Sequence, residues 1–188
     1  MDDFAEFFAA TRDGAYRAVF AATGTRTGAE DAVAEAYARG YANWAVLSEH
    51  PEPVAWILRT ALNTHRSLWR RLRREVLGEA PPDRAGLSAE PSSLDGSVRA
   101  AVAALPRRQR EVLALRVLAD LSAEQTGGIL GLAPSTVHVH LHRALAALRK
   151  RLTDDGRGVD GRAAVPAEQS GGVDMIEFTM GRVVRLAY

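Results

Sequence analysis

The feature that most constrains the fold of this 188-residue chain is the stretch LSAEQTGGILGLAPSTVHVHLHRALAALRKRL. Ser122 and Gln125 form a capping box, which predicts the start of a helix. Gly131–Ala133 supplies a three-residue turn, and Pro134 is typical of the first turn of a further helix. Two helices joined in this way, with the small Gly127 where they would cross, predict a helix-turn-helix.

The second helix of this motif has an apolar face and a polar face. At spacings of three and four, its inward positions are Val137, Leu141, Ala144, Leu145 and Leu148. A helix reads the major groove only if residues near its N-terminus reach base edges while arginines hold phosphates. The candidate DNA-binding residues are therefore Ser135, Thr136, His138, Val139, His140 and Arg143. A plain helical hairpin in a bundle is the alternative.

The histidines of this helix also raise the question of a metal site. His138 and His142 lie one turn apart, but no carboxylate nearby completes a ligand set, and the HExxH pattern is absent. We also find no phosphate-cradling glycine loop, no nucleophile elbow and no acid pair suited to catalysis. The sequence therefore predicts no metal, no cofactor and no enzymatic activity.

The charge of the chain is sorted into blocks. The net charge of +1 divides into 0 for residues 1–76, −3 for 77–96, +6 for 97–153 and −2 for 154–188. A basic block beside an acidic stretch rich in Pro, Ser and Gly is typical of a nucleic-acid-binding module on a linker, although a solvated arginine-rich helix face would carry the same charge. We expect two domains at 1–76 and 97–153, a flexible acidic linker at 77–96 and a C-terminal extension at 154–188.

Helical periodicity predicts an all-α fold. In the first domain, helices are expected over residues 3–22 and 29–44 and from Pro53 onward, with a loop of about nine residues from Ala45 to Pro53. Two short helices should follow the linker, ahead of the helix-turn-helix. The tail is the exception, because residues 173–188 alternate in polarity and Met180-Gly181 offers the turn of a short β-hairpin.

Several classes of protein are excluded by composition. The chain has no cysteine, so it holds neither a disulfide framework nor a thiolate zinc site. No apolar run approaches the roughly 20 residues that span a bilayer, and the acidic first residues do not resemble a signal peptide. We expect a cytoplasmic protein with no membrane partner.

Four strings then appear in a recognisable order and spacing. They are AEDAVAEA at 29–36, PVAWILRTALN at 53–63 with the arginine pair at 70–71, LPRRQREV at 105–112 and STV…LHRA at 135–144. This order resembles the extracytoplasmic-function (ECF) sigma factors, the small bacterial factors that direct RNA polymerase to promoters. The resemblance covers about residues 4–153. It implies a sigma domain two-like helical bundle and a sigma domain four-like helix-turn-helix.

The resemblance also implies roles for particular residues. The acidic helix would dock on core RNA polymerase through Glu30, Asp31, Val33 and Glu35. The loop before Pro53 and the helix after it would open and read the minus-ten element through Arg59, Asn63, Arg66, Arg70 and Arg71. Arginines suit this role because they hold single-stranded phosphate. Trp44 and Trp56 are expected in the core. The recognition helix would read the minus-thirty-five element, and an anti-sigma factor or another regulator would be a further partner.

The chain departs from the family at the recognition helix and the tail. Ala133 replaces the usual capping serine, and His138 and His140 stand where relatives carry Lys or Arg. Because histidine titrates near neutral pH, we expect the second domain to bind its promoter more tightly at pH 6 than at pH 8. The tail either folds back on the sigma domains, recruits a regulator or is an inert extension.

The alternative function is a helix-turn-helix regulator that binds operator DNA without polymerase. Such a regulator usually needs a dimer interface to place two recognition helices one DNA turn apart, and the sequence shows no heptad pattern that supplies one. The sequence therefore favours a sigma factor that binds core polymerase and directs promoter recognition, DNA melting and transcription initiation.

Overall fold

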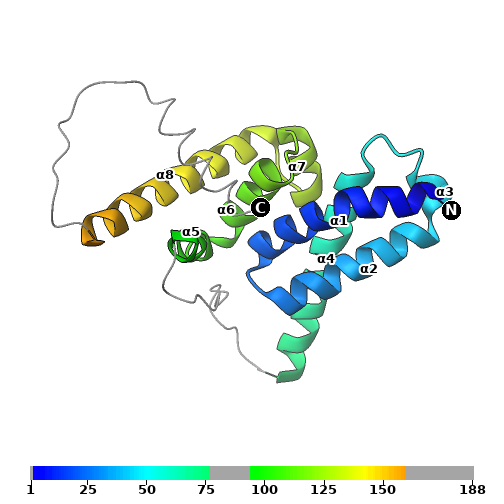
Figure 1. The fold of residues 1–188 in the computed structure, drawn as a ribbon, viewed down its shortest axis with the longest axis horizontal. Coiled ribbons are helices and arrows are strands. Elements are labelled where there is room, and N and C mark those ends of the chain that lie inside the picture. Colours follow the sequence, from blue (N-terminus) through cyan, green and yellow to red (C-terminus); the bar gives the residue numbers. More distant parts are fainter. Residues whose placement is uncertain (1, 77–93, 160–188) are drawn as a thin grey trace.

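The computed structural model describes residues 2–76 and 94–159, and every regular element in these two ranges is a helix (Figure 1). The first half contains α1 (Asp2–Thr23), α2 (Arg26–Ala42), α3 (Trp44–Leu47) and α4 (Pro53–Val76). The second half contains α5 (Leu94–Ala103), α6 (Arg107–Leu113), the π-helical turn η1 (Ala114–Leu118), α7 (Ala123–Leu130) and α8 (Pro134–Val159). The all-α prediction is confirmed for this part of the chain.

The three long helices of the first half pack against one another. Helices α1, α2 and α4 form the bundle, and their buried side chains are mostly alanines with a few large aliphatic residues. Ile57 and Leu58 are fully buried on α4. Trp44 and Trp56 pack against the same cluster, and Trp44 also meets the rings of Phe4 and Phe7. The prediction that these two tryptophans belong to the core is confirmed.

The expected loop from Ala45 to Pro53 is shorter in the structure. The short helix α3 takes its first residues, and its end is closed by a hydrogen bond from the Ser48 amide to the Trp44 carbonyl. Leu47 is buried in the core, which explains why the chain makes a helical turn there before reaching α4. The prediction of a continuous nine-residue loop was wrong at this point.

The second half is built around α8. Helices α5, α6 and α7 all contact it, and Val137, Ala144 and Leu148 on its inner face are fully buried. Leu141 and Leu145 are half-buried beside them. The predicted inward face is therefore confirmed. Helix α8 runs to Val159, beyond the expected domain end at residue 153.

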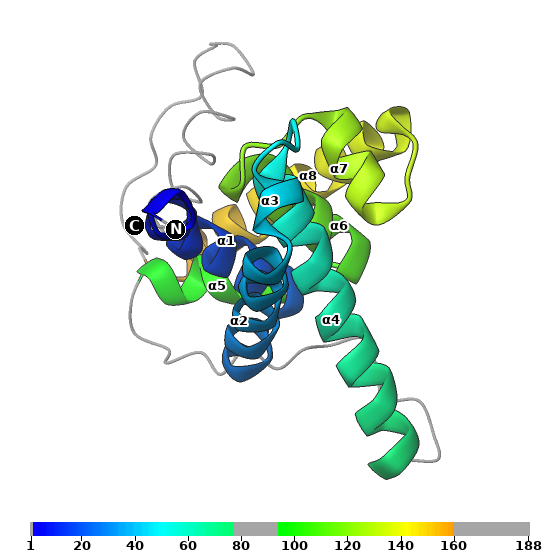
Figure 2. The same cartoon turned by 90° about the vertical axis from the view of Figure 1, so that its right-hand side faces the viewer.

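The two halves pack directly on each other. Helix α1 contacts α6 and η1, and α4 contacts α7. One buried cluster contains Leu58 and Leu62 of the first half together with Val112, Leu115 and Val137 of the second. In Figure 2 the second half lies beside α1 and α4, whereas the C-terminal part of α4 projects away from the body. The structure is thus a closed arrangement of the two predicted domains.

Two predicted segments lie largely outside the described residues. Residues 77–93 contain most of the predicted linker, and α5 already begins at Leu94. Residues 160–188 include the predicted β-hairpin.

Candidate nucleic-acid interface

The helix-turn-helix is held in shape by local hydrogen bonds. The Ser122 hydroxyl accepts from the Gln125 amide at 3.1 Å, and the Gln125 side chain accepts from the Ser122 amide at 2.6 Å, so the predicted capping box is confirmed. Gly131 ends α7 in the left-handed conformation, with φ of 69°. This conformation suits glycine because an L side chain would be strained there. The chain is thereby turned into α8.

Gly127 lies where α7 closely approaches the turn. A Cβ atom at this position would lie 2.5 Å from the backbone oxygen of Leu132. The Gly127 carbonyl also accepts a hydrogen bond from the Leu132 amide at 2.9 Å, which holds the two segments together. The small side chain expected here is therefore a structural requirement of the motif.

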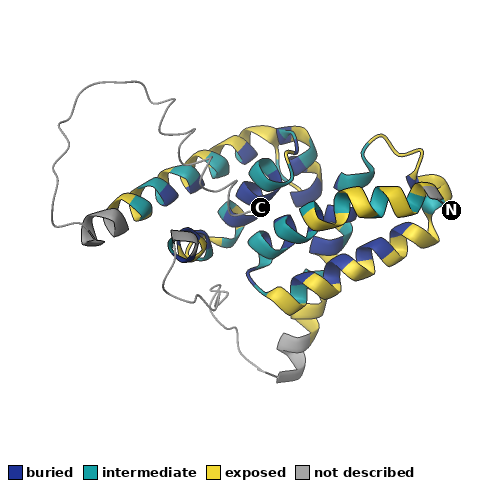
Figure 3. Ribbon diagram, viewed as in Figure 1, coloured by how far each residue is buried: buried dark blue, intermediate teal, exposed yellow. Residues whose placement is uncertain are grey.

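The predicted recognition residues lie on the outer side of α8, which Figure 3 shows as the exposed face of a helix running away from the first half. Ser135, His138, Val139 and Arg143 are exposed, with Val139 at 47%. Thr136 and His140 are half-buried, and the Nδ1 atom of His140 is buried with no hydrogen-bond partner. His138 is therefore better placed than His140 to reach a base edge. Lys150 and Arg151, farther along α8, are exposed and available to phosphates.

The predicted minus-ten residues form a stripe along α4. Arg59, Asn63, Arg66 and Arg70 are spaced by four, three and four residues, which places them on one side of a helix. Arg59, Asn63 and Arg70 are exposed, as is Arg71 next to the stripe. Trp69 is 40% exposed in the same segment. This part of α4 combines positive charge with an accessible aromatic ring.

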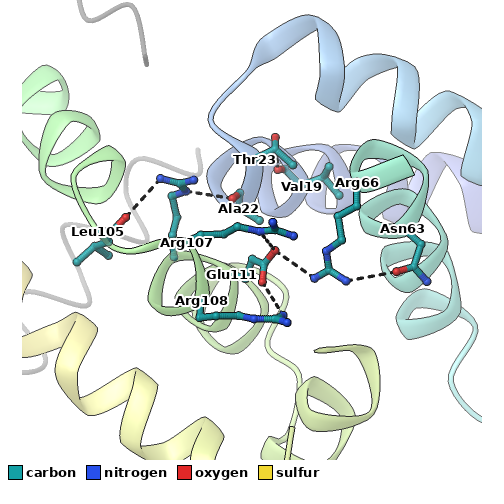
Figure 4. A network of polar contacts seen from close by, with 10 residues as sticks. Val19, Ala22, Thr23, Asn63, Arg66, Leu105, Arg107, Arg108 and Glu111 are labelled. Carbon is teal, nitrogen blue, oxygen red and sulfur yellow. Dashed lines mark hydrogen bonds and ion pairs between the residues drawn. The ribbon is translucent and has the colours of Figure 1, made fainter. Parts of the chain in front are cut away.

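Arg66 differs from the other residues of the stripe because the second half of the chain holds it. Its guanidinium donates to Asn63 Oδ1 at 3.3 Å and to Glu111 Oε1 on α6 at 3.1 Å (Figure 4). The side chain of Glu111 is only 4% exposed and also binds Arg107 and Arg108, at 3.0 and 3.1 Å. Burial raises the pKa of Glu111, but Arg66 and Arg107 outweigh it and hold that pKa below its usual value.

Two further contacts across the halves were not predicted from the sequence. Arg110, which is 3% exposed, donates to the Ala22 carbonyl of α1 at 3.0 Å and to the Ala103 carbonyl of α5 at 3.0 Å. Gln125 donates to Glu52 Oε1 at 2.7 Å. A local pattern could not reveal the two contacts across the halves, because Arg110 is 88 residues from Ala22 and Gln125 is 73 residues from Glu52.

The acidic edge of α2 is accessible in the structure. Glu30, Asp31 and Glu35 are exposed, and Glu35 binds Arg39 of the same helix at 2.7 Å. Val33 is 4% exposed and belongs to the core, so its side chain is not available to a partner. The prediction of a contact through Val33 was wrong, because Val33 faces the bundle that α2 forms with α1 and α4, whereas the contact through the three carboxylates stays a prediction.

His65 lies beside the interface between the halves and should make stability depend on pH. Burial lowers its pKa below 6.5, Arg107 and Arg66 lower it further, and Glu111 acts in the opposite direction. The unfolded chain thus binds the proton more readily, so stability should fall as pH drops through 6.5 toward the lowered pKa. The drop in melting temperature from pH 7.5 to pH 5.5 should be smaller in His65→Gln than in the unaltered chain. Equal drops in the two proteins would contradict this assignment.

Neither a metal centre nor a membrane span is found in the described part of the chain. Its His, Asp and Glu side chains form no group of three or more that could hold a metal ion. None of its helices combines the length and apolar character needed to cross a bilayer.

Comparison with known proteins gives consistent results. Residues 95–148 match the protein family described as Sigma-70, region 4. The chain is 36% identical over 137 residues to an RNA polymerase sigma-E factor of Streptomyces antibioticus, covering 72% of this chain and 75% of that protein. It is 31% identical over 163 residues to the sigma-E factor of Streptomyces coelicolor, covering 86% and 91%.

The fold is also similar to that of a solved structure. The sigma factor RpoE of Bartonella quintana, crystallised with the anti-sigma factor NepR, superposes with a TM-score of 0.69 at 23% identity, over 82% of this chain and 99% of that one. Together with the sequence matches and the helix-turn-helix described above, this shows that the chain belongs to the ECF family of RNA polymerase sigma factors.

Proposed function

We propose that this sigma factor contacts core RNA polymerase through the acidic edge of α2 and reads its promoter with two separate helices. In this proposal α4 holds the minus-ten element and α8 reads the minus-thirty-five element. The observation that carries the proposal is the exposed outer face of α8, presented by a complete helix-turn-helix with its capping box and left-handed glycine. The chain itself performs no catalytic step, and it acts in the cytoplasm with the polymerase.

The roles of the two DNA-binding helices follow from their side chains. The stripe on α4 carries guanidinium groups, which hold phosphates and favour single strands without reading sequence. The face of α8 carries Ser135 and His138, short or flat polar groups that can hydrogen-bond to base edges. The fold shared with a sigma factor that binds an anti-sigma factor supports a regulator of that kind as a further partner.

Run-off transcription with purified bacterial core polymerase and a pooled promoter library tests the proposal. New transcripts that share a two-part upstream motif, appearing only with this protein, are the expected result. If the chain does not bind core polymerase at all, the proposal fails and a regulator that acts alone on operator DNA replaces it.

Arg59→Ala should weaken promoter binding by the assembled holoenzyme about equally for all sequences. On single strands, each lost phosphate contact reduces the steepness of log K plotted against the logarithm of salt concentration by about 0.7. We expect this reduction with an affinity loss of roughly tenfold, measured by fluorescence anisotropy at several salt concentrations. Arg12→Ala, which removes an exposed arginine of α1, is the matched control and should leave the slope unchanged. A slope unaffected by Arg59→Ala would exclude a phosphate contact there.

A further inference from the structure

One large apolar side chain stands on the outer face of α8, where the proposed function places DNA (Figure 3). Among the large hydrophobic residues that the structure describes between positions 96 and 153, Val139 is the one that is exposed, at 47%. An isopropyl group gains nothing from water, and valine is a weaker helix former than alanine. Val139 therefore adds little to the stability of the free chain, and a contact made only in a complex would explain it.

Val139 points almost directly away from the core. The inner direction of α8 is defined by its fully buried residues, Val137, Ala144 and Leu148. Successive residues of an α-helix are rotated by about 100°, which places Val139 about 160° from this inner direction. His138 lies about 100° and His140 about 60° from it, in agreement with the exposure of His138 and the partial burial of His140. The centre of the outer face is thus Val139, with the two histidines at its sides.

The other residues at the centre of this face are short. Ser135 and Ala146 lie about 160° and 180° from the inner direction, and both are exposed. Neither side chain is long enough to cover the isopropyl group of Val139. Arg143, which is exposed one turn beyond Val139, can hold a phosphate at the edge of the groove while the centre of the face enters it. Because the major groove is about 12 Å wide and admits a helix, Val139 would meet the base edges.

One base presents an apolar group in the major groove. Thymine carries its 5-methyl group there, whereas guanine, adenine and cytosine are recognised through hydrogen-bond donors and acceptors. A valine held against those polar groups would remove water from them without supplying a hydrogen bond, which is unfavourable. Against thymine, the isopropyl group and the methyl group both leave water, which is favourable. The chemistry of the side chain therefore selects one base.

We propose that Val139 reads a thymine of the minus-thirty-five element through the 5-methyl group of that base, and so fixes the identity of one base pair. The proposal rests on the proposed function, because it takes α8 as the helix that enters the groove. Burying one methyl group against an apolar partner changes affinity by about fourfold. Ser135 and His138 remain to hydrogen-bond to neighbouring bases.

The test replaces thymine by deoxyuridine, which removes the 5-methyl group and leaves the pairing edge of the base unchanged. Holoenzyme assembled from core polymerase and the full-length chain is titrated with duplexes of its selected promoter, each carrying one deoxyuridine on either strand of the minus-thirty-five element. We expect one position at which the replacement weakens binding about fourfold. Val139→Ala should bind the thymine and deoxyuridine duplexes equally at that position. Deoxyuridine in the spacer between the two elements should have no effect on either protein.

A second variant shows whether the effect belongs to Val139 itself. His142→Ala shortens an exposed neighbour on the same helix and should keep the fourfold preference for thymine, whatever its overall affinity. Both variants must keep the helical circular dichroism of the unaltered chain. The proposal is overturned if the selected minus-thirty-five element has no thymine on either strand, or if deoxyuridine has no effect at any position. It is also overturned if the preference survives in Val139→Ala or disappears in His142→Ala.

The same measurement separates this proposal from the proposed function. If the chain does not bind core polymerase, the replacements are repeated with the full-length chain alone, on the duplexes that it selects. A methyl effect that is lost in Val139→Ala would then support the contact, although the proposed function has failed. A holoenzyme that transcribes from a two-part promoter but does not respond to the methyl group would give the reverse result. A chain that binds no DNA in either form contradicts both proposals.

Discussion

Gly127→Ala is expected to lower the free energy of unfolding by about 3 kcal/mol, because the added methyl group would meet backbone. The new Cβ would lie 2.5 Å from the Leu132 oxygen, and no rotation of a side chain can relieve that contact. Relief would require moving the turn, which would strain the hydrogen bond from the Leu132 amide to the Gly127 carbonyl. Chemical denaturation followed by circular dichroism measures the loss, and minus-thirty-five binding should fall with it.

The neighbouring glycine provides a matched control with the opposite sign. Gly128 is exposed in the same helix, and a Cβ there would meet nothing within 4 Å. Alanine is favoured over glycine in a helix interior by up to about 1 kcal/mol, so Gly128→Ala should stabilise the chain slightly. Equal effects of the two substitutions would show that helix propensity, and not the approach of the turn, decides the outcome.

The helix-turn-helix could be predicted in detail because its determinants are local. The capping box joins residues three apart, the turn occupies three residues, and the inward face of α8 repeats every three or four positions. Such features depend on backbone geometry that neighbouring residues fix among themselves. For the same reason both ends of α1 lie within one residue of the predicted helix, and α4 begins at Pro53 as predicted.

The packing of the two halves could not be predicted, since it depends on pairs far apart in the sequence. Arg66 and Glu111 are separated by 45 residues, and either one alone is an ordinary charged residue on a helix. Val33 was misassigned because the family resemblance marks the whole acidic helix as a docking surface and does not separate its outer side chains from those that face the core. The charge pattern identified the basic half and the family resemblance indicated the arginines of α4, and burial was needed to show which of these side chains are accessible.

Arg110→Met is expected to destabilise the chain by about 3 kcal/mol, because it leaves carbonyl oxygens without their donor. The Arg110 guanidinium binds the Ala22 and Ala103 carbonyls at 3.0 Å, at the C-terminal ends of two helices. A buried polar group that loses its partner costs about 1–3 kcal/mol, and methionine keeps much of the apolar volume. The loss corresponds to a fall of roughly 10 °C in melting temperature, measured by calorimetry. Arg99→Met, which replaces an exposed arginine of α5, should stay within about 0.5 kcal/mol of the unaltered chain. If the two variants lose similar amounts of stability, Arg110 stabilises the chain no more than an exposed arginine does. The hydrogen bond between α6 and α1 would then add nothing to the free energy of unfolding.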